Sequence, residues 1–487
     1  MNNLTDRNAP WREELRAAMP AAERTAIPRA VMPVLDPSER IRNNKEVNRG
    51  LTPAQAVLEA TRCLDCPNPG CVNGCPVNIN IPAFIKNVQR GDIKGAATVL
   101  SLTSALPAVC GRVCPQEKQC ESGCIYLKMH KEPVAIGYLE RFAADTAREE
   151  NLTPEPLMAS PNGIRIAVVG SGPSGLSFAG DMIKLGYDIT VFEALHEIGG
   201  VLKYGIPEFR LPNSVVDAEL ENLSKLGVRF EKDTVIGKTL SLDDLLNDGF
   251  KAVYVASGAG LPRFMGIPGE NLNGVLSSNE YLTRINLMGA GRPGAMTPVV
   301  HGKRIMVVGG GNTAMDSVRT ARRMGADEAI IVYRRSREEM PARLEEIRHA
   351  EEEGVKFLTL HNPVEYIGNE KGRVVAVRLQ RMRLGEPDAS GRRAPEPIEG
   401  DIVEMPVDAV IVSVGVSPNP LIPDSVDGLE VTRKGTIAVD ENLRTALPVM
   451  YAGGDIVRGG ATVILAMGDG RHAAAAMHKA FQEQNLS

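Results

Sequence analysis

Aromatic residues and long apolar runs are scarce in this sequence. Aromatic side chains make up 4% of the 487 residues, with a single tryptophan, which does not favour an aromatic-rich β-sandwich. No run approaches about 18 apolar residues, so we expect no transmembrane helix. Residues 1–16 are polar and charged and lack the apolar stretch of a signal peptide, so we expect a cytoplasmic protein.

Charge of one sign is not in excess either. The 55 lysines and arginines nearly balance the 60 aspartates and glutamates, and the formal net charge is −5. This balance excludes a strongly cationic nucleic-acid binder, and no basic tail is present. We expect neither nucleic acid nor a membrane as a partner. The length predicts about three domains.

Cysteine is absent after Cys124, and all eight cysteines lie between Cys63 and Cys124. Disulfides are not expected in a cytoplasmic protein, so this clustering indicates metal. The spacing is Cys63-x2-Cys66-x4-Cys71-x3-Cys75-Pro76, then Cys110-x3-Cys114-Pro115-x4-Cys120-x3-Cys124. Only the first pair has zinc-ribbon spacing, whereas the Cys-Pro runs are typical of ferredoxins. We expect two [4Fe–4S] clusters, with two zinc sites or free structural thiols as alternatives.

The cysteine before proline in a ferredoxin run binds the other cluster. That logic assigns one cluster to Cys75, Cys114, Cys120 and Cys124. The other cluster keeps Cys63, Cys66 and Cys71 and needs a fourth ligand. Cys110 is the obvious thiol candidate for it.

A first glycine loop follows a buried-strand run at 164–169 and opens a helix; it reads Gly170-Ser171-Gly172-Pro173-Ser174-Gly175. The first glycine permits the tight turn, the second lets the backbone approach a pyrophosphate, and the third permits close helix–strand packing. The pyrophosphate would lie at the helix N-terminus, near Pro173 and Ser174. Glu193 ends the next strand, where a ribose-binding acid is expected. The alternative is an ordinary glycine-rich turn.

A second loop repeats the plan after a strand at 303–308 and reads Gly309-Gly310-Gly311-Asn312-Thr313-Ala314. The strand that follows ends without an acid, in Tyr333-Arg334-Arg335-Ser336-Arg337. Arginines at this place suit the 2′-phosphate of NADP. We expect Arg334 and Arg335, ahead of Arg337, to bind it; a solvated basic run is the alternative.

Two dinucleotide sites suggest a flavin and a nicotinamide, with FAD on the first loop and NADPH on the second. Near the C-terminus, a strand-like segment ends in Gly454 and Asp455, and Ala461 and Thr462 precede a helix. Asp455 would face the flavin ribityl chain, and the helix N-terminus would face the flavin ring. This requires the last ~50 residues to return to the first nucleotide domain. A simple Gly-Asp turn is the alternative.

We therefore expect an α/β protein with two Rossmann-like dinucleotide-binding domains of the disulfide-reductase type, preceded by a helical domain with two [4Fe–4S] clusters. The helical domain is placed at 1–150, with helices near 82–91, 94–102 and 134–149 after an irregular arm that ends near residue 40. The FAD domain is placed at 163–290 and 430–487, and the NADPH domain at 300–415.

This order of motifs resembles the glutamate synthase small subunit. It is also similar to the large subunit of electron-bifurcating NADH-dependent ferredoxin:NADP oxidoreductase and to the N-terminal part of dihydropyrimidine dehydrogenase. The resemblance covers roughly 35–487 and rests on Cys110-Gly111-Arg112-Val113-Cys114-Pro115, Tyr204-Gly205-Ile206-Pro207-Glu208-Phe209-Arg210-Leu211-Pro212, Val308-Gly309-Gly310-Gly311-Asn312-Thr313-Ala314-Met315-Asp316 and Ala452-Gly453-Gly454-Asp455. Gly200, Val201 and Leu202, just before the second phrase, complete the expected cofactor-binding residues.

The resemblance implies a different fourth ligand for the first cluster. In these relatives the fourth ligand of the first cluster is a carboxylate or amide on the helix after the last cysteine. Aligned through 133–137, that position is Glu140, which we favour over Cys110. The spacing around Cys110 departs from the classical small subunit and is closer to the transhydrogenase large subunit.

The resemblance implies an electron-input subunit that oxidises NADPH and passes electrons on. The chain has no N-terminal cysteine nucleophile for a glutaminase and is too short to add an FMN-binding barrel, so we expect a second redox subunit. That partner is a glutamate synthase large subunit or a ferredoxin reductase-like flavoprotein. Hydride transfer needs geometry more than an acid or base, so we name no catalytic side chain. The alternatives are the bifurcating large subunit and a non-redox nucleotide-binding protein with structural zinc.

Overall fold

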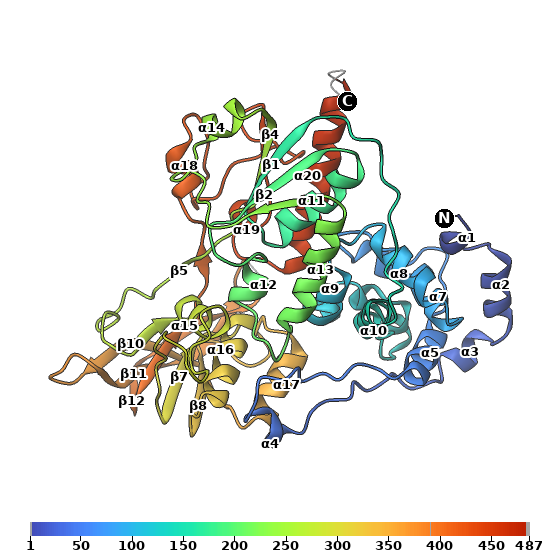
Figure 1. The fold of residues 1–487 in the computed structure, drawn as a ribbon. Helices are drawn as coiled ribbons and strands as arrows, with labels where there is room; N and C mark the ends of the chain where they lie inside the picture. The colour runs from blue at the N-terminus through green and yellow to red at the C-terminus, as the bar shows by residue number, and fades with distance from the viewer. Residues whose placement is uncertain (1, 390, 484–487) are drawn as a thin grey trace.

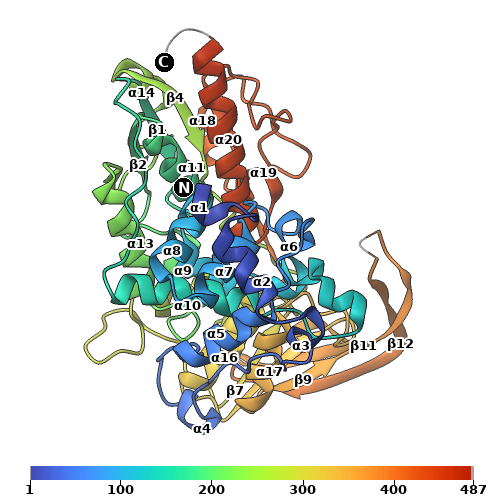
Figure 2. The ribbon, with the colours of Figure 1, turned by 90° about the vertical axis from the view of Figure 1, so that its right-hand side faces the viewer.

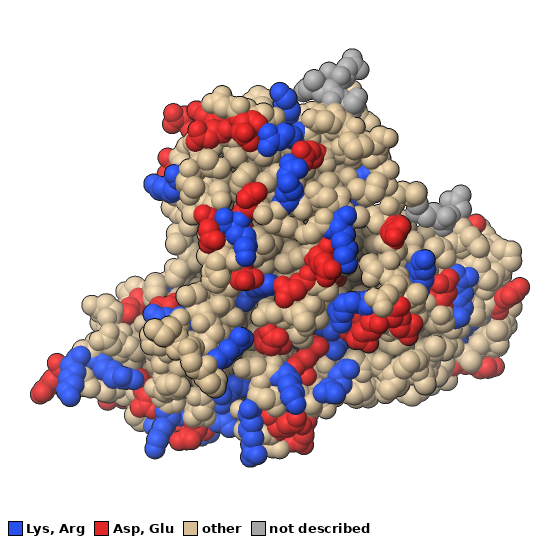
Figure 3. Space-filling model, in the orientation of Figure 1, with Lys and Arg blue, Asp and Glu red and all other residues tan. Residues whose placement is uncertain are grey.

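A helical unit is followed by two parallel sheets in the computed structural model (Figure 1). The structure describes residues 2–389 and 391–483; Met1, Ser390 and residues 484–487, which fall within the expected domains, lie outside the described residues. Basic and acidic side chains are interspersed over the face drawn in Figure 3. Among the described residues, no helix is both long and apolar enough to cross a membrane.

Short helices build the N-terminal unit. They are α1 (Asn2–Thr5), α2 (Pro10–Ala17), α3 (Ala21–Arg24), α4 (Pro37–Arg40), α5 (Pro53–Arg62), α6 (Gly70–Asn73), α7 (Ile81–Gln89), α8 (Ile93–Ser101), α9 (Pro107–Val113), the 3₁₀ turns η1 (Gln116–Lys118), η2 (Glu121–Gly123) and η3 (Ile125–Met129), and α10 (Ile136–Glu149). Helix α5 begins with a capping box in which Thr52 and Gln55 each accept the other's backbone N–H.

The segment before residue 40 is not the irregular arm that we expected, because it contains α1 to α4. Helices α1 to α3 lie beside the other helices of the unit (Figure 2), whereas Arg40 of α4 pairs with Glu352. Arg12 on α2 is buried and reaches Asp65 at 2.5 Å, and Arg16 reaches the same carboxylate at 2.6 Å. The Asp65 side chain is fully buried, so it needs these cationic partners. The anchor is 53 residues away in sequence, and local composition does not reveal it.

The first sheet is parallel and includes a strand from the C-terminal part of the chain. Its order is β15-β4-β1-β2-β3, with β1 (Arg165–Val169), β2 (Asp188–Phe192), β3 (Arg229–Glu231), β4 (Phe250–Val255) and β15 (Met450–Ala452). Its helices are α11 (Pro173–Lys184), α12 (Val201–Tyr204), α13 (Asn213–Lys225), α14 (Leu242–Asn247), α18 (Leu421–Ser425), α19 (Asp455–Arg458) and α20 (Val463–Glu483). Helix α20 packs along α11 (Figure 1).

The second sheet is also parallel, in the order β6-β13-β7-β8-β9. It contains β6 (Val275–Ser277), β7 (Arg304–Val308), β8 (Glu328–Tyr333), β9 (Lys356–Thr359) and β13 (Ala409–Val412), with α15 (Ser278–Asn286), α16 (Asn312–Arg323) and α17 (Leu344–Glu352). Residues 275–286, which we placed in the first nucleotide domain, therefore belong to the second, because β6 pairs with β13. A three-residue edge strand carries too little pattern to be assigned from sequence.

An antiparallel sheet that we did not expect covers one side of the second unit. It consists of β10 (His361–Gly368), β11 (Val374–Pro387) and β12 (Arg393–Pro406). The β11–β12 hairpin projects from the body of the molecule (Figure 2). A two-stranded link of β5 (Leu261–Pro262) and β14 (Val416–Ser417) connects the two nucleotide-binding units.

The hydrophobic cores show how the units are joined. One core runs from the cysteine region into the first sheet and includes Val113, Phe178 and Met467. The second sheet has separate cores on its two faces. The helical unit and the first sheet are thus joined by shared apolar packing, whereas the second sheet is an independently packed body.

Candidate functional site

The first glycine loop has the three properties that a dinucleotide loop needs. Gly170 has φ +102°, and a Cβ there would lie 2.5 Å from the carbonyl oxygen of Ala256. A Cβ on Gly175 would lie 2.1 Å from the carbonyl oxygen of Gly170. A Cβ on Gly172, in contrast, would meet no protein atom within 4 Å. The middle glycine thus faces open space at the start of α11, where Pro173 is the first helical residue and a pyrophosphate fits.

Glu193 follows β2 and holds the loop as well as lining the cavity. Its carboxylate is buried and accepts hydrogen bonds from the backbone N–H of Ser171 at 3.0 Å and of Leu195 at 2.9 Å. The Ser171 hydroxyl also donates to Glu193. The residue expected to bind ribose therefore has a second role, because it fixes the tight turn beside it.

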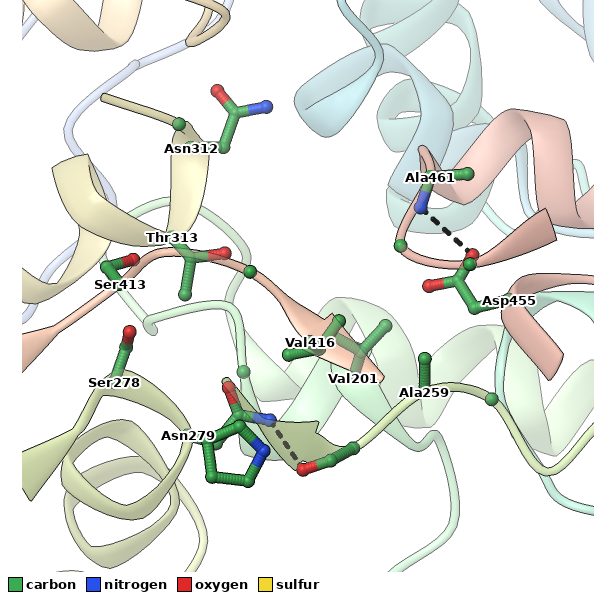
Figure 4. Close-up of a pocket in the computed structure, with 18 of the residues that line it drawn as sticks. Val201, Ala259, Ser278, Asn279, Asn312, Thr313, Ser413, Val416, Asp455 and Ala461 are labelled. Carbon is green, nitrogen blue, oxygen red and sulfur yellow. Dashed lines mark hydrogen bonds between the residues drawn. The ribbon is translucent and has the colours of Figure 1, made fainter. Parts of the chain in front are cut away.

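The C-terminal segment lies against the first loop. Gly454 has φ +77°, and a Cβ there would lie 2.8 Å from the Ser174 Cβ. Asp455 follows it, and its carboxylate accepts a hydrogen bond from the backbone N–H of Ala461 at 3.2 Å (Figure 4). Burial raises the pKa of Asp455 to about 6. Thr462 precedes α20 and also lines the cavity.

The segment 200–202 divides between the cavity and the core. Gly200 lies against the first loop, since a Cβ on it would be 2.9 Å from the Gly172 Cα. Gly200 and Val201 line the cavity, and Val201 faces it in Figure 4. Leu202 is completely buried and is not a lining residue. The structure therefore gives Leu202 a packing contact in place of the expected cofactor contact.

The second loop repeats this geometry. A Cβ on Gly309, where φ is +141°, would lie 2.2 Å from the carbonyl oxygen of Ser413, whereas a Cβ on Gly311 would meet nothing within 4 Å. Asn312 and Thr313 follow at the start of α16 and line the cavity (Figure 4). Ala314 is completely buried, as the close-packing position of the motif requires.

The arginines after β8 are not equivalent. Arg334 is exposed and lines the cavity. Arg335 also lines the cavity, but it is buried, donates to the carbonyl oxygen of Arg393 at 2.9 Å and forms an ion pair with Asp388. Arg392 and Arg393 reach the same cavity from the β11–β12 hairpin. These two arginines could not be predicted from the sequence, because nothing local places a distant hairpin beside β8.

Both loops line one cavity of about 2520 Å³. This volume exceeds that of a site for one drug-sized ligand, about 300–1,000 Å³, so it has room for two dinucleotides. Figure 4 shows Asn312 and Thr313 of the second loop on one side and Asp455 and Ala461 of the C-terminal segment on the other. Val113, Pro115, Glu117 and Lys118 of the helical unit also line it. The cysteine region is therefore part of the cavity wall.

The cysteines fall into two sets through the pairing of two short segments. A Cβ on Gly70 would lie 2.5 Å from the carbonyl oxygen of Gly123, and a Cβ on Gly74 would lie 3.3 Å from the Cys120 Cα. Segments 70–75 and 119–124 therefore run side by side. This places Cys71 next to Cys124, and Cys75 next to Cys120.

The electrostatic neighbours of the thiols give the same division. Burial raises the pKa of Cys71 most, and the charges of Cys63, Cys124 and Cys66 add to it. Burial raises the pKa of Cys75 to about 11, and among the charges that act on it Glu140 is the largest. Glu140 also acts on Cys114 and Cys120.

The sequence predicted a different grouping of the ligands. It placed Cys124 with Cys75, Cys114 and Cys120, and Glu140 with the first three cysteines. The paired segments and the charges around the thiols instead favour an all-cysteine set of Cys63, Cys66, Cys71 and Cys124, and a Glu140 set of Cys75, Cys114, Cys120 and Glu140. In both groupings Cys75 is separate from Cys63, Cys66 and Cys71, and the difference is that Cys124 and Glu140 change places.

Glu140 has the environment expected of a carboxylate that binds a metal cluster. It is buried on α10, and its Oε1 has no hydrogen-bond partner among the described residues. Burial, together with the charge of Glu219, raises its pKa to about 8. Cys110 lies near the same set, but its Sγ is 3.5 Å from the Met467 Sδ. A buried oxygen without a partner fits a metal ligand better than a thiol packed against a thioether.

The side chains do not converge on a single ion. Among residues 2–389 and 391–483, no three His, Cys, Asp or Glu side chains are placed to hold one metal ion. A [4Fe–4S] cluster takes one ligand on each of four irons, so its ligands are spread more widely than those around zinc. The two ligand sets are therefore not arranged as single-ion sites.

Family models match the two parts of the chain separately. Residues 40–152 match dihydropyrimidine dehydrogenase domain II, 4Fe-4S cluster, and residues 164–480 match pyridine nucleotide-disulphide oxidoreductase. A solved structure of FprA from Mycobacterium tuberculosis in complex with NADPH has a TM-score of 0.56 at 22% identity, covering 66% of this chain and 86% of that one. The expected fold class is confirmed.

Relatives match almost the full length. The glutamate synthase [NADPH] small chain of Escherichia coli (strain K12) is 38% identical over 436 residues, which are 88% of this chain and 92% of that one. The NADPH-Fe(3+) oxidoreductase subunit beta of Geobacter sulfurreducens is 35% identical over 481 residues, which are 93% of this chain and 69% of that one.

Proposed function

Because the chain belongs to the glutamate synthase small-chain family, we propose that it passes electrons from NADPH through FAD and two [4Fe–4S] clusters to a glutamate synthase large subunit. The chain is an NADPH-dependent flavin and iron–sulfur oxidoreductase. Its relatives are small or beta subunits of larger redox enzymes, so it acts with a partner subunit.

The observation that carries the proposal is the shared cavity. The flavin would be held by residues of the first loop and the C-terminal segment, namely Gly170, Gly172, Pro173, Ser174, Gly175, Glu193, Gly200, Val201, Gly454, Asp455, Ala461 and Thr462. NADPH would be held by Gly309, Gly311, Asn312, Thr313 and Arg334. Bound FAD supplies a hydride acceptor that can release electrons singly. The protein's part is to bind and orient, since the transfer needs geometry and no acid or base.

The cysteine region borders the cavity. Pro115, directly after Cys114, lines the cavity, and Gln119 donates to Thr462 at 3.4 Å. The Glu140 set is thus beside the flavin segment. In the all-cysteine set, Cys66, Cys71 and Cys124 are partly exposed. We infer that electrons leave at the surface around these three cysteines.

The test is anaerobic titration of the purified protein with NADPH, with NADH as the matched control, while the visible spectrum is recorded. We expect flavin bleaching together with a fall in the broad iron–sulfur absorbance, and much less of both with NADH. No iron–sulfur absorbance and no bleaching would overturn the proposal. Capture of the partner then distinguishes a glutamate synthase large subunit from a ferredoxin reductase-like flavoprotein.

A further inference from the structure

Six buried charges lie where the second sheet meets the flavin side. Arg210, in the segment between α12 and α13, belongs to the flavin side, and its neighbours Ile206 and Leu211 pack into the core of that side. The others are on α16 and α17 or directly after α17. Their side chains are at most 5% exposed; they are Arg210, Asp316, Arg319, Arg323, Glu346 and Glu353.

Within this cluster, Arg210 makes the ion pairs that connect the flavin side to the second sheet's unit. Its Nη1 donates to both carboxylate oxygens of Asp316 at 2.7 Å, and its Nε lies 3.3 Å from a Glu346 oxygen. Arg319 then joins Glu346 to Glu353. Phe209, next to Arg210, lies under the guanidinium of Arg323 at 3.8 Å.

The position of Asp316 ties this contact to the nucleotide loop. Asp316 is one helical turn after Asn312 on α16, so the two lie on the same face of the helix. Arg210, Asp316 and Asn312 all line the cavity. The two family motifs at 204–212 and 308–316 are thus in contact through Arg210 of the first and Asp316 of the second.

Apolar packing would join the two units at least as strongly as these buried ion pairs do, because burying charges carries a large desolvation cost. What a planar guanidinium facing a carboxylate adds is direction, since its donors lie in a rigid fork. The pair therefore fixes the angle between α16 and the flavin segment, whereas an apolar contact, which has no preferred direction, would not fix it.

We propose that Arg210 and Asp316 are a positioning pair that holds the NADPH-binding helix α16 at a fixed orientation to the flavin segment, and so aligns the two cofactors for hydride transfer. The proposal rests on the function proposed above. Neither residue exchanges a proton or a hydride. Their effect is exerted through the loop and the segment that they join.

The test compares D316N and R210K with D181N in the holoprotein. Asp181 pairs with Arg471 at 2.8 Å between α11 and α20, inside the flavin unit, and is the matched control. Flavin reduction is followed by stopped flow with NADPH and with NADPH deuterated at the transferred position. Amide hydrogen exchange over 204–212 and 312–323 is measured without NADPH. R210K keeps the charge that Asp316 needs, so it remains informative if D316N folds poorly.

We expect D316N and R210K to slow flavin reduction by about tenfold or more, since small misplacement is costly in hydride transfer. The maximal rate falls more than the KM for NADPH rises, the isotope effect increases, and exchange rises in both segments. D181N leaves all four unchanged. Equal slowing in D181N, or unchanged reduction rates in both D316N and R210K, would overturn the pair's positioning role. Failure of NADPH to bleach the unmodified protein would instead overturn the proposed function itself.

Discussion

Arg343 donates a hydrogen bond to the backbone carbonyl oxygen of Arg112, 2.6 Å away, and thereby joins the NADPH side to the helix that leads into Cys114. The same guanidinium donates to Gln116 at 2.8 Å. The Arg343 backbone N–H donates to the Asn312 side chain at 2.9 Å. One residue thus touches both the second glycine loop and the cysteine region.

Replacing Arg343 by alanine should loosen the cysteine region. Hydrogen bonds to a charged group contribute about 1.5–3 kcal/mol, and two buried acceptors would lose their donor. We expect faster removal of iron from R343A by a chelator under anaerobic conditions. The control is R348A, because Arg348 lies on α17, which begins directly after Arg343, and its side chain is 57% exposed. Equal rates in the two variants would contradict this role.

Substitution of the middle glycine of each loop should affect one cofactor and not the other. Gly172 and Gly311 have ordinary φ values of −71° and −90°, and a Cβ on either meets only open space. G172A should therefore fold but lose most of its FAD, because the methyl group occupies the place of a pyrophosphate. G311A should retain FAD and bind NADPH more weakly. FAD content and a titration with NADPH measure the two effects; FAD loss in G311A would argue against the assignment.

The arginines after β8 should behave differently on substitution. R334A should weaken NADPH binding about 10- to 100-fold, the value of a charge-assisted contact, and leave NADH binding unchanged. R335A should mainly loosen the β11–β12 hairpin, because the ion pair of Arg335 with Asp388 and its hydrogen bond to the Arg393 carbonyl oxygen are lost. Flavin bleaching with each nucleotide tests this, and R337A, which removes an exposed pair with Glu351, is the control. A larger NADPH effect in R335A than in R334A would reverse the assignment.

Glu140 and Cys110 can be distinguished by iron content. E140A should lose one cluster, and with it about half of the iron and part of the spectrum of the reduced clusters. C110A should keep both clusters, because Cys110 packs against Met467 and is not one of the proposed ligands. Iron analysis and electron paramagnetic resonance of the reduced protein measure the difference. Retention in E140A with loss in C110A would make the thiol the ligand.

Glu219 should make stability depend on pH. It lies on α13 and accepts a hydrogen bond from the Ala108 N–H at 2.9 Å, and burial raises its pKa to about 7 from 4.5. A raised carboxyl pKa means that the folded state binds the proton more tightly. Stability is therefore fully present below about pH 4.5 and is lost as the pH rises to about 7.

E219Q should remove this loss while keeping an oxygen for Ala108. The variant should gain up to about 3 kcal/mol over the unmodified protein at pH 8 and almost nothing at pH 4.5, since each pKa unit corresponds to 1.36 kcal/mol. Anaerobic urea unfolding at the two pH values measures this. The nearby charges of Arg148, Asp145 and Arg112 are unchanged in both proteins. A gain that is the same at both pH values would show that Glu219 does not titrate in this range.

Local features could be predicted from the sequence and distant contacts could not. Strands β1 and β7 lie within one residue of the runs expected at 164–169 and 303–308, because hydrophobic runs and glycine loops are local signals. The partner of Cys124 depends on how segment 119–124 lies beside 70–75, which spacing does not encode. Likewise the ion pair of Arg335 with Asp388 requires a hairpin more than 50 residues away to fold over β8. The cysteine spacing and the family resemblance predicted the candidate ligands, whereas the grouping that we favour depends on the fold.

The return of β15 to the first sheet has a consequence for biosynthesis. Strand β4 becomes an interior strand only when Met450–Ala452 leaves the ribosome, and α11 gains its neighbour α20 still later. At about 5–20 residues per second, the delay after β4 is on the order of 10 to 40 s. The second sheet needs only residues 275–412 and can fold during this delay. Until then the growing chain exposes the unpaired edge of β4, and this is the stage at which a nascent polypeptide has most to gain from a chaperone.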